Sequence, residues 1–270
     1  MPRIAVAQTC SHDNIPENLK LASALIAKAA AKGACAVFLP ECFALMQTSR
    51  KQLRECAEIH GDGLIQETMS EAARQHKVTV FAGTLPIRST DSKRVFNSSL
   101  VYDSDGTELA RYDKIHLFDV HLDNGEQYLE SAYTMPGSKI VTLDCCLGKV
   151  GLTVCYDLRF PEIYRQLVNQ EVQIFVVPSA FSSQTGPAHW HTLLRARAIE
   201  NFCYVIASAQ EGTHSSGRKT YGHSVVVDPW GKVVAEKQTG EGLLITEIDL
   251  KKVKQAREQI PSLEHRRQFS

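Results

Sequence analysis

Residues 148–180, GKVGLTVCYDLRFPEIYRQLVNQEVQIFVVPSA, decide the fold class of this chain. Within them, the apolar, β-branched run at 149–154 predicts a buried strand, and Pro161 begins a segment to Asn169 that predicts a helix. The run at 173–180 predicts a second buried strand. Strands that are apolar throughout and alternate with helices are typical of a sheet covered on both faces. The stretch therefore predicts an α/β protein.

The amino-terminal part of the chain repeats this alternation. The apolar pattern predicts strands at 3–8, 36–40 and 78–83, with helices at 14–33 and 61–77. Asn14 is a typical helix-capping residue, and Gly33 closes the first helix.

The remaining elements are mixed. Alternating runs around a turn predict hairpins at 98–114 and 223–237. Further strands are predicted at 139–144, 203–210 and 242–250, with helices at 188–201 and from about Leu250.

The two hairpins can be superimposed in sequence. Ser99, Val101, Asp103 and Gly106 match Ser224, Val226, Asp228 and Gly231. The match predicts two related halves, although hairpins often look alike for local reasons alone. Two sheets facing each other, with helices outside both, would bury both sets of strands. Because no linker or low-complexity segment interrupts the pattern, we expect a single domain over residues 1–270.

Composition excludes several classes of protein. The chain has 270 residues, with 30 Lys and Arg against 30 Asp and Glu, and 43% of its residues are hydrophobic. These are globular values, which exclude global disorder, and a net charge of zero argues against a nucleic-acid-binding protein. The apolar run at 4–7 is too short for a signal peptide, and no stretch approaches the ~18 apolar residues of a membrane span. We expect a soluble, cytoplasmic protein without membrane partners.

Eight cysteines stand at positions 10, 35, 42, 56, 145, 146, 155 and 203. A chain of this length with a large core does not need a disulfide framework, so we expect a reducing compartment. Cys155 differs from the rest, because it ends a strand and precedes polar residues and the helix that begins at Pro161. Backbone N–H groups at such a position can face a developing negative charge.

Two other strand ends carry charged residues. Glu41 follows the strand at 36–40, and Lys114 ends the hairpin at 98–114. Active sites of α/β sheets tend to lie at strand ends, so Glu41, Lys114 and Cys155 form a candidate catalytic set. Alternatively, Glu41 and Lys114 are a plain ion pair.

Other chemistries find less support. A Cys–His dyad stays open, with His116, His189, His191, His214 and His223 as partners. His189 and His191 have a spacing that suggests a metal, but no Cys-x-x-Cys or His-Glu-x-x-His motif accompanies them, so we expect no metal. No Walker or Gly-x-Gly-x-x-Gly loop occurs, and we expect no cofactor.

Four motifs, in this order, resemble the nitrilase superfamily of carbon–nitrogen hydrolases over essentially the full chain. They are LPECF with Glu41, RYDKIHLFD with Lys114, YLES with Glu130 and GLTVCYDLRFPE with Cys155. The resemblance implies a four-layer α-β-β-α sandwich with pseudo-two-fold halves and a cofactor-free hydrolase that forms at least a homodimer.

The resemblance also implies roles for these residues. Cys155 attacks an amide carbon and forms a thioester, and Glu41 serves as general base and acid. Lys114 and the backbone N–H of Tyr156 hold the oxyanion. Glu130 positions Lys114 or assists proton movement, unless it is only a surface acid at a helix start.

In finer detail, PSAFSSQTGPAHWHTLLRARAIE and YGHSVVVDPWG resemble the branch that hydrolyses deaminated glutathione, a metabolite-repair reaction. This implies an amide substrate that bears carboxylates, bound by Arg159, Phe181 and Thr185. The ω-amidase branch, acting on 2-oxoglutaramate or 2-oxosuccinamate, shares TGPAHW and is the alternative. His191 departs from the pattern, because many relatives carry Glu there.

Two alternatives come from other classes of protein. One is a non-catalytic binding protein on the same fold. The other is a redox protein that uses Cys145 and Cys146.

Overall fold

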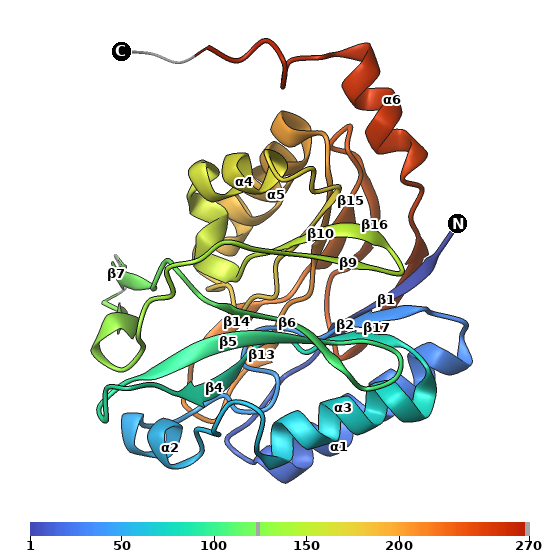
Figure 1. The fold of residues 1–270 in the computed structure, drawn as a ribbon. Coiled ribbons are helices and arrows are strands. Elements are labelled where there is room, and N and C mark those ends of the chain that lie inside the picture. The colour runs from blue at the N-terminus through green and yellow to red at the C-terminus, as the bar shows by residue number, and fades with distance from the viewer. Residues whose placement is uncertain (123–124, 268–270) are drawn as a thin grey trace.

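The computed structural model describes residues 1–122 and 125–267. Two β-sheets lie face to face, with helices α1 (Ile15–Ala31) and α3 (Leu64–His76) outside the first sheet. Helices α4 (Pro161–Val168) and α5 (Gly186–Asn201) lie outside the second sheet (Figure 1). The predicted four-layer α-β-β-α sandwich is confirmed.

The first sheet has seven strands in the order β17-β1-β2-β3-β5-β4, with β6 also paired to β5. They are β1 (Arg3–Gln8), β2 (Ala36–Phe38), β3 (Thr79–Phe81), β4 (Leu85–Arg88), β5 (Val95–Tyr102), β6 (Glu108–Asp113) and β17 (Gly242–Glu247). Strands β1, β2 and β3 are parallel, and the others pair antiparallel to their neighbours.

The second sheet has six strands in the order β16-β15-β12-β11-β10-β9. They are β9 (Val141–Cys145), β10 (Gly148–Leu152), β11 (Ile174–Val176), β12 (Tyr204–Ala207), β15 (Ser224–Val227) and β16 (Val233–Lys237). Strands β10, β11 and β12 are parallel. Helix α6 (Lys251–Gln259) follows the last strand of the first sheet.

The two sheets are copies of one plan. The path β17-β1-β2-β3-β5-β6 matches β9-β10-β11-β12-β15-β16 in order and direction. Helices α1 and α3 connect the parallel strands of the first set, with the short helix α2 (Arg50–Glu55) before α3, and α4 and α5 connect those of the second. Both predicted hairpins shift register at the same place, between Val101 and Tyr102 and between Val226 and Val227. In both turns a glycine with positive φ donates to the aspartate three residues before it, at 2.9 and 2.8 Å. The predicted pseudo-two-fold halves are confirmed.

Alternating side chains on the strands build two cores. On β1, Ile4 and Val6 pack between the sheets, whereas Ala5 and Ala7 pack toward α1 and α3. This is the period of two that a strand buried on both faces requires. Each fully buried aliphatic or aromatic side chain contributes about 1.5–3 kcal/mol, so these layers hold the sheets in a fixed relation.

The observed strands are shorter than the predicted ones where they approach the site. The strand predicted at 36–40 ends at Phe38, and the one at 173–180 ends at Val176. Pro40 and Pro178 follow these ends, and proline has no N–H for a central ladder. The regular ladders end there, and Glu41 and Ala180, a little beyond these prolines, line one pocket.

Several short elements were not predicted. They are α2 (Arg50–Glu55), β4, the pair β7 (Asp119–His121) and β8 (Gln127–Leu129), and the pair β13 (Glu211–Thr213) and β14 (Lys219–Tyr221). These elements have three to six residues, which are too few to show a periodic pattern. None of the helices within the described ranges is long and apolar enough to cross a membrane.

Gly83 allows the ends of β2 and β3 to touch. Its φ is +40°, and a Cβ at this position would lie 1.9 Å from the carbonyl oxygen of Pro40, next to Glu41. Any side chain here would push the Glu41 segment away from the sheet.

We expect Gly83→Ala to lower the free energy of unfolding by about 3 kcal/mol, because it adds a backbone clash to an unfavourable φ. Gly217→Ala is the matched control, since Gly217 has φ +82° with no atom within 4 Å of the added Cβ. Its cost should be only about 1 kcal/mol, from φ alone. Urea unfolding of both variants measures the difference, and equal losses would contradict the role of the close approach.

Candidate active site

Chain segments that leave the two sheets bring the predicted catalytic residues together. Glu41 lies three residues after β2, and Lys114 directly follows β6. Cys155 lies three residues after β10 and begins the 3₁₀ helix η2 (Cys155–Arg159). All three line one pocket together with Glu130, which begins the 3₁₀ helix η1 (Glu130–Ala132).

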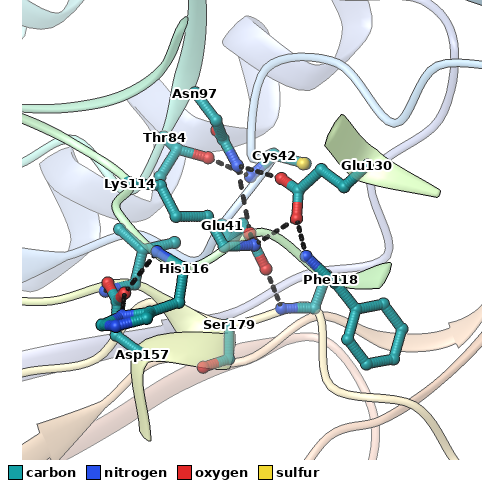
Figure 2. Close-up of polar contacts among 12 residues, drawn as sticks. Glu41, Cys42, Thr84, Asn97, Lys114, His116, Phe118, Glu130, Asp157 and Ser179 are labelled. Carbon is teal, nitrogen blue, oxygen red and sulfur yellow. Dashed lines mark hydrogen bonds and ion pairs between the residues drawn. The ribbon is translucent and has the colours of Figure 1, made fainter. Parts of the chain in front are cut away.

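Lys114 is the centre of a buried cluster of charges. Its Nζ lies 2.9 Å from Oε1 of Glu41 and 2.9 Å from Oε2 of Glu130, and its side chain is 2% exposed (Figure 2). Burial disfavours the ammonium, but the two carboxylates outweigh that cost and hold the pKa of Lys114 well above its usual value. Lys114 is therefore a fixed cation.

The Glu41 carboxylate is held by three donors. Oε1 accepts from Lys114 and, at 3.1 Å, from Nδ2 of Asn97, while Oε2 accepts from the backbone N–H of Ala180 at 2.8 Å. Burial alone would raise the pKa of Glu41, but the charge and hydrogen bond of Lys114 lower it below the usual value. Glu41 is thus ionised at rest and can accept a proton.

Cys155 stands in a strained backbone conformation. Its φ is +46°, in the left-handed region, and its N–H donates to the carbonyl of Pro178 at 3.0 Å. Such a conformation costs about 1–3 kcal/mol in a residue other than glycine and is typical of functional sites. The surrounding hydrogen bonds hold it in place.

The Cys155 thiol is protonated at rest. Burial raises its pKa, and so do the charge and hydrogen bond of Glu41, while Lys114 and Arg218 act in the opposite direction and are outweighed. The lowering effect of Lys114 on the thiol pKa is therefore only part of the balance. Glu41, the hydrogen-bond partner of the thiol, is placed to accept its proton.

Arg218 is a pocket residue that the sequence did not reveal. Its guanidinium donates to the carbonyl of Ala180 and lies 5.2 Å from the ring centroid of Tyr128. Its Nε is buried without a hydrogen-bond partner in the described part of the chain. Since Arg218 lies between β13 and β14 in no recognisable motif, only the tertiary structure places it here.

Proton transfer within the pocket leaves its net charge unchanged. Glu41 and Glu130 supply two negative charges, and Lys114, Arg159 and Arg218 supply three positive ones. A proton that moves from Cys155 to Glu41 changes neither the number of protons nor this sum. A thiolate can thus form without a change in the net charge of the pocket.

Glu130 is a buried residue, so its interpretation as a surface acid is wrong. Only 7% of it is exposed, and Oε2 accepts from the backbone N–H of Phe118 at 2.7 Å as well as from Lys114. Asn97 lies between the two glutamates, 3.4 Å from Oε1 of Glu130. Glu130 therefore fixes the position of the Lys114 ammonium.

Asp157 joins the nucleophile turn to the segment that carries Lys114. Its fully buried carboxylate accepts from the hydroxyl of Tyr112 at 2.7 Å and from the N–H of Val154 at 2.8 Å. The ring Nδ1 and the backbone N–H of His116 complete the set, at 2.7 and 3.0 Å (Figure 2). The sequence did not indicate this role.

The predicted substrate-binding residues line the same pocket. Arg159 lies over the rings of Tyr156 and Phe181, at 5.8 and 5.4 Å, and its Nη1 is 3.2 Å from Nδ1 of His189. The structure gives it no ion pair with a carboxylate among the residues it describes. The Thr185 hydroxyl is buried without a partner in the same ranges.

Two alternative sets of reactive residues lie outside the pocket in the described part of the chain. Within the described ranges no histidine lines the pocket, so the structure offers no Cys155–His dyad. Cys145 and Cys146 lie at the turn between β9 and β10, and neither lines the pocket.

A buried thiol, a carboxylate that can accept its proton and a fixed cation, on a four-layer α-β-β-α scaffold, are the groups that hydrolysis through a thiol nucleophile requires. The chain belongs to the carbon–nitrogen hydrolase family, whose model matches residues 3–258.

Known proteins resemble this chain closely. A protein of Synechocystis sp. (strain PCC 6803 / GT-S) named deaminated glutathione amidase is 42% identical over 269 residues, which are 98% of either chain. The crystal structure of the Caenorhabditis elegans NitFhit protein matches with a TM-score of 0.93 and 40% identity, over 98% of this chain and 65% of that one. An amidase from Nesterenkonia sp. AN1, seen after addition of acrylamide at its active site cysteine, matches with a TM-score of 0.80 and 25% identity, over 97% and 99% of the chains.

We expect Lys114→Met to lower the free energy of unfolding at pH 7 by about 3–5 kcal/mol, because it leaves two buried carboxylates without their cation. In the wild type, the pKa of Glu41 is lower in the folded state than in the unfolded state. The contribution of Glu41 to the free energy of unfolding is therefore complete above its unfolded-state pKa, and it is lost as the pH falls through its folded-state pKa. In the variant, burial should raise the pKa of Glu41 above its unfolded value. The difference in the free energy of unfolding between the wild type and Lys114→Met should then become smaller as the pH falls from 8 to 5.

Urea unfolding of both proteins across this range measures the difference. Lys51→Met is the control, because Lys51 pairs with Glu55 at the surface and should cost less than about 0.5 kcal/mol at every pH. A deficit that does not change with pH would show that Lys114 does not keep the glutamates ionised.

Proposed function

We propose that this carbon–nitrogen hydrolase is an amidase that converts deaminated glutathione to 2-oxoglutarate and cysteinylglycine. The observation that carries the proposal is a buried Glu41–Lys114–Glu130 cluster beside Cys155 in a pocket that also contains two arginines. The relative from Synechocystis named deaminated glutathione amidase, which is similar over nearly the whole chain, supports this choice of substrate.

The reaction begins with transfer of the Cys155 proton to Glu41. The thiolate attacks the amide carbon, and the resulting oxyanion lies against Nζ of Lys114 and the backbone N–H of Tyr156. The first N–H groups of a helix have no partner inside it, and Tyr156 is the second residue of η2. An oxyanion donor of this kind contributes about 3–4 kcal/mol to lowering the barrier.

The second half of the reaction returns every proton to its starting place. Protonated Glu41 gives its proton to the leaving nitrogen, the C–N bond breaks, and a thioester to Cys155 remains. Glu41 then takes a proton from water as the hydroxyl attacks the thioester carbon. The C–S bond breaks, the acid leaves, and Glu41 returns the proton to the sulfur.

The arginines of the pocket suit a substrate with more than one carboxylate. Deaminated glutathione carries one carboxylate on its 2-oxo-acid half and another on its glycine. The Nε of Arg218 has no hydrogen-bond partner among the residues that the structure describes, and Arg159 lies farther along η2 over two rings. Both arginines line the pocket that also holds Cys155.

An ω-amidase acting on 2-oxoglutaramate is the second candidate, because its substrate has the same reacting half. It needs only one carboxylate-binding group, which makes the presence of two arginines the observation that favours the larger substrate. A non-catalytic binding protein would need none of the proton-transfer arrangement around Cys155.

We further propose that the protein is cytoplasmic and forms a homodimer or a larger homo-oligomer. All eight cysteines are free thiols, as in reducing compartments. Ile199 and Trp230, 45% and 58% exposed, lie on neighbouring parts of α5 and the β15–β16 turn, and such apolar side chains are typical of interfaces. A molar mass of one chain, measured in solution by light scattering, would contradict the proposed oligomer.

Release of 2-oxoglutarate from deaminated glutathione tests the activity. We expect Cys155→Ala to lower kcat by at least about 10⁴-fold, because no nucleophile remains. Glu41→Gln keeps the shape but cannot accept the proton, and should lose about 10²–10⁴-fold. Cys203→Ala is a control at a buried thiol outside the pocket and should keep its kcat. A wild-type protein that releases no 2-oxoglutarate would refute the substrate, and an active Cys155→Ala would refute the mechanism.

Conservative arginine variants distinguish the two substrates. Lysine keeps the charge but loses the planar fork that binds a carboxylate through two hydrogen bonds. We expect Arg218→Lys to reduce kcat/KM about 10–100-fold for both deaminated glutathione and 2-oxoglutaramate, since it binds the shared half. Arg159→Lys should affect deaminated glutathione alone. If Arg159→Lys reduced kcat/KM equally for the two substrates, both arginines would bind the 2-oxo-acid half, and the result would favour the ω-amidase.

A further inference from the structure

A second cluster of chemically capable side chains lies outside the catalytic pocket. His191 belongs to the first turns of α5, His223 directly precedes β15, and Glu236 lies on β16. None of the three lines the pocket. They are separated by 32 and 13 positions in the sequence, so no local motif reveals them.

The three side chains converge on one oxygen. Nε2 of His191 lies 2.8 Å and Nδ1 of His223 lies 2.6 Å from the same Oε1 of Glu236. One ligand atom from each residue lies within 4.8 Å of the other two. The imidazole rings are nearly perpendicular, with an interplanar angle of 82° and centroids 5.3 Å apart. Their nitrogens therefore approach Glu236 from two different directions.

We propose that His191, His223 and Glu236 form a binding site for a first-row divalent transition metal ion such as Zn²⁺. Two imidazoles and one carboxylate are the ligands that these ions prefer, whereas Mg²⁺ and Ca²⁺ prefer oxygen alone. The proposal is independent of the amidase reaction.

The distances suit this occupant. Metal–ligand bonds of about 2.0–2.2 Å in a tetrahedral site place ligand atoms about 3.4 Å apart. The His–Glu separations would have to open by about 0.7 Å from the present contacts, and the separation between the histidine nitrogens is already within 4.8 Å. Side-chain adjustments of this size need no change in the backbone.

The surroundings fix the ligands in advance. The His223 ring stacks on Tyr221 with centroids 4.2 Å apart, and its backbone has φ +57°, a strained conformation that the fold maintains. Its carbonyl accepts from Nε1 of the buried Trp190, the residue before His191. Two of the three ligands are thus connected through a fixed contact.

The cluster is also reachable from solvent. The side chains of His191, His223 and Glu236 are 31%, 20% and 21% exposed, which leaves room for water as the fourth ligand. A bound ion would clamp the start of α5 to the β15–β16 hairpin.

Co²⁺ is the probe of choice, because its visible spectrum reports ligand type. The host is full-length Cys155→Ala, which removes the reactive thiol. We expect one Co²⁺ per chain, with d–d bands and no thiolate charge-transfer band. A free concentration of Zn²⁺ about 100 times Kd should raise Tm by about 5 °C.

His191→Gln and Glu236→Gln, made in the same host, should each weaken Co²⁺ binding at least tenfold. Both retain a group able to hydrogen-bond, and circular dichroism verifies their folding. His60→Gln is the matched control, because His60 lies 2.8 Å from Glu108 in a pair without a second histidine. Its Co²⁺ affinity should not change.

Three results would overturn the proposal. They are Co²⁺ binding at less than one ion per chain, binding that survives in both His191→Gln and Glu236→Gln, or a spectrum dominated by thiolate charge transfer. The first would leave the three residues as a hydrogen-bonded cluster, and the other two would place the ion elsewhere, the third on cysteines.

Discussion

The buried Lys114 ammonium between two glutamates is the interaction on which the rest of the site depends. A charge taken out of water is tolerated only where partners surround it, so every element that supplies a partner is constrained to one place. Glu41 and Lys114 come from the first sheet, and Ala180, which donates to Glu41, follows a strand of the second. The charge cluster therefore also sets how the two sheets meet at this edge.

The same arrangement explains how a buried thiol can be protonated at rest and still have a proton acceptor beside it. The pKa of Cys155 is raised by burial and by Glu41, and the pKa of Glu41 is lowered chiefly by Lys114 against the effect of burial. The proton thus rests on sulfur and has a prepared acceptor. In the proposed reaction, substrate binding needs only to favour transfer of the proton from Cys155 to Glu41. Asp157 and Glu130 hold the surrounding groups in place through hydrogen bonds.

The sequence predicted the fold well because local patterns determine it. Apolar runs located the long strands, Asn14 caps α1 as expected, and the paired turns identified two halves. Strand ends alone suggested Glu41, Lys114 and Cys155, and the resemblance added Glu130. Arg218, Asp157 and the cluster around Glu236 escaped, because each depends on contacts between distant segments. Sequence spacing carries no record of such contacts unless a family pattern is known.

The duplication of the fold has a consequence for how catalysis is divided. The pairing of β1 with β2 and of β10 with β11 makes Thr9 the counterpart of Cys155, and Ser179 the counterpart of Glu41. In each case, the corresponding position of the other half carries a residue with a hydroxyl group. In the proposed reaction, one half supplies the proton acceptor and the cation, and the other supplies the nucleophile. Neither half contains all three groups, so the site requires both halves of the fold.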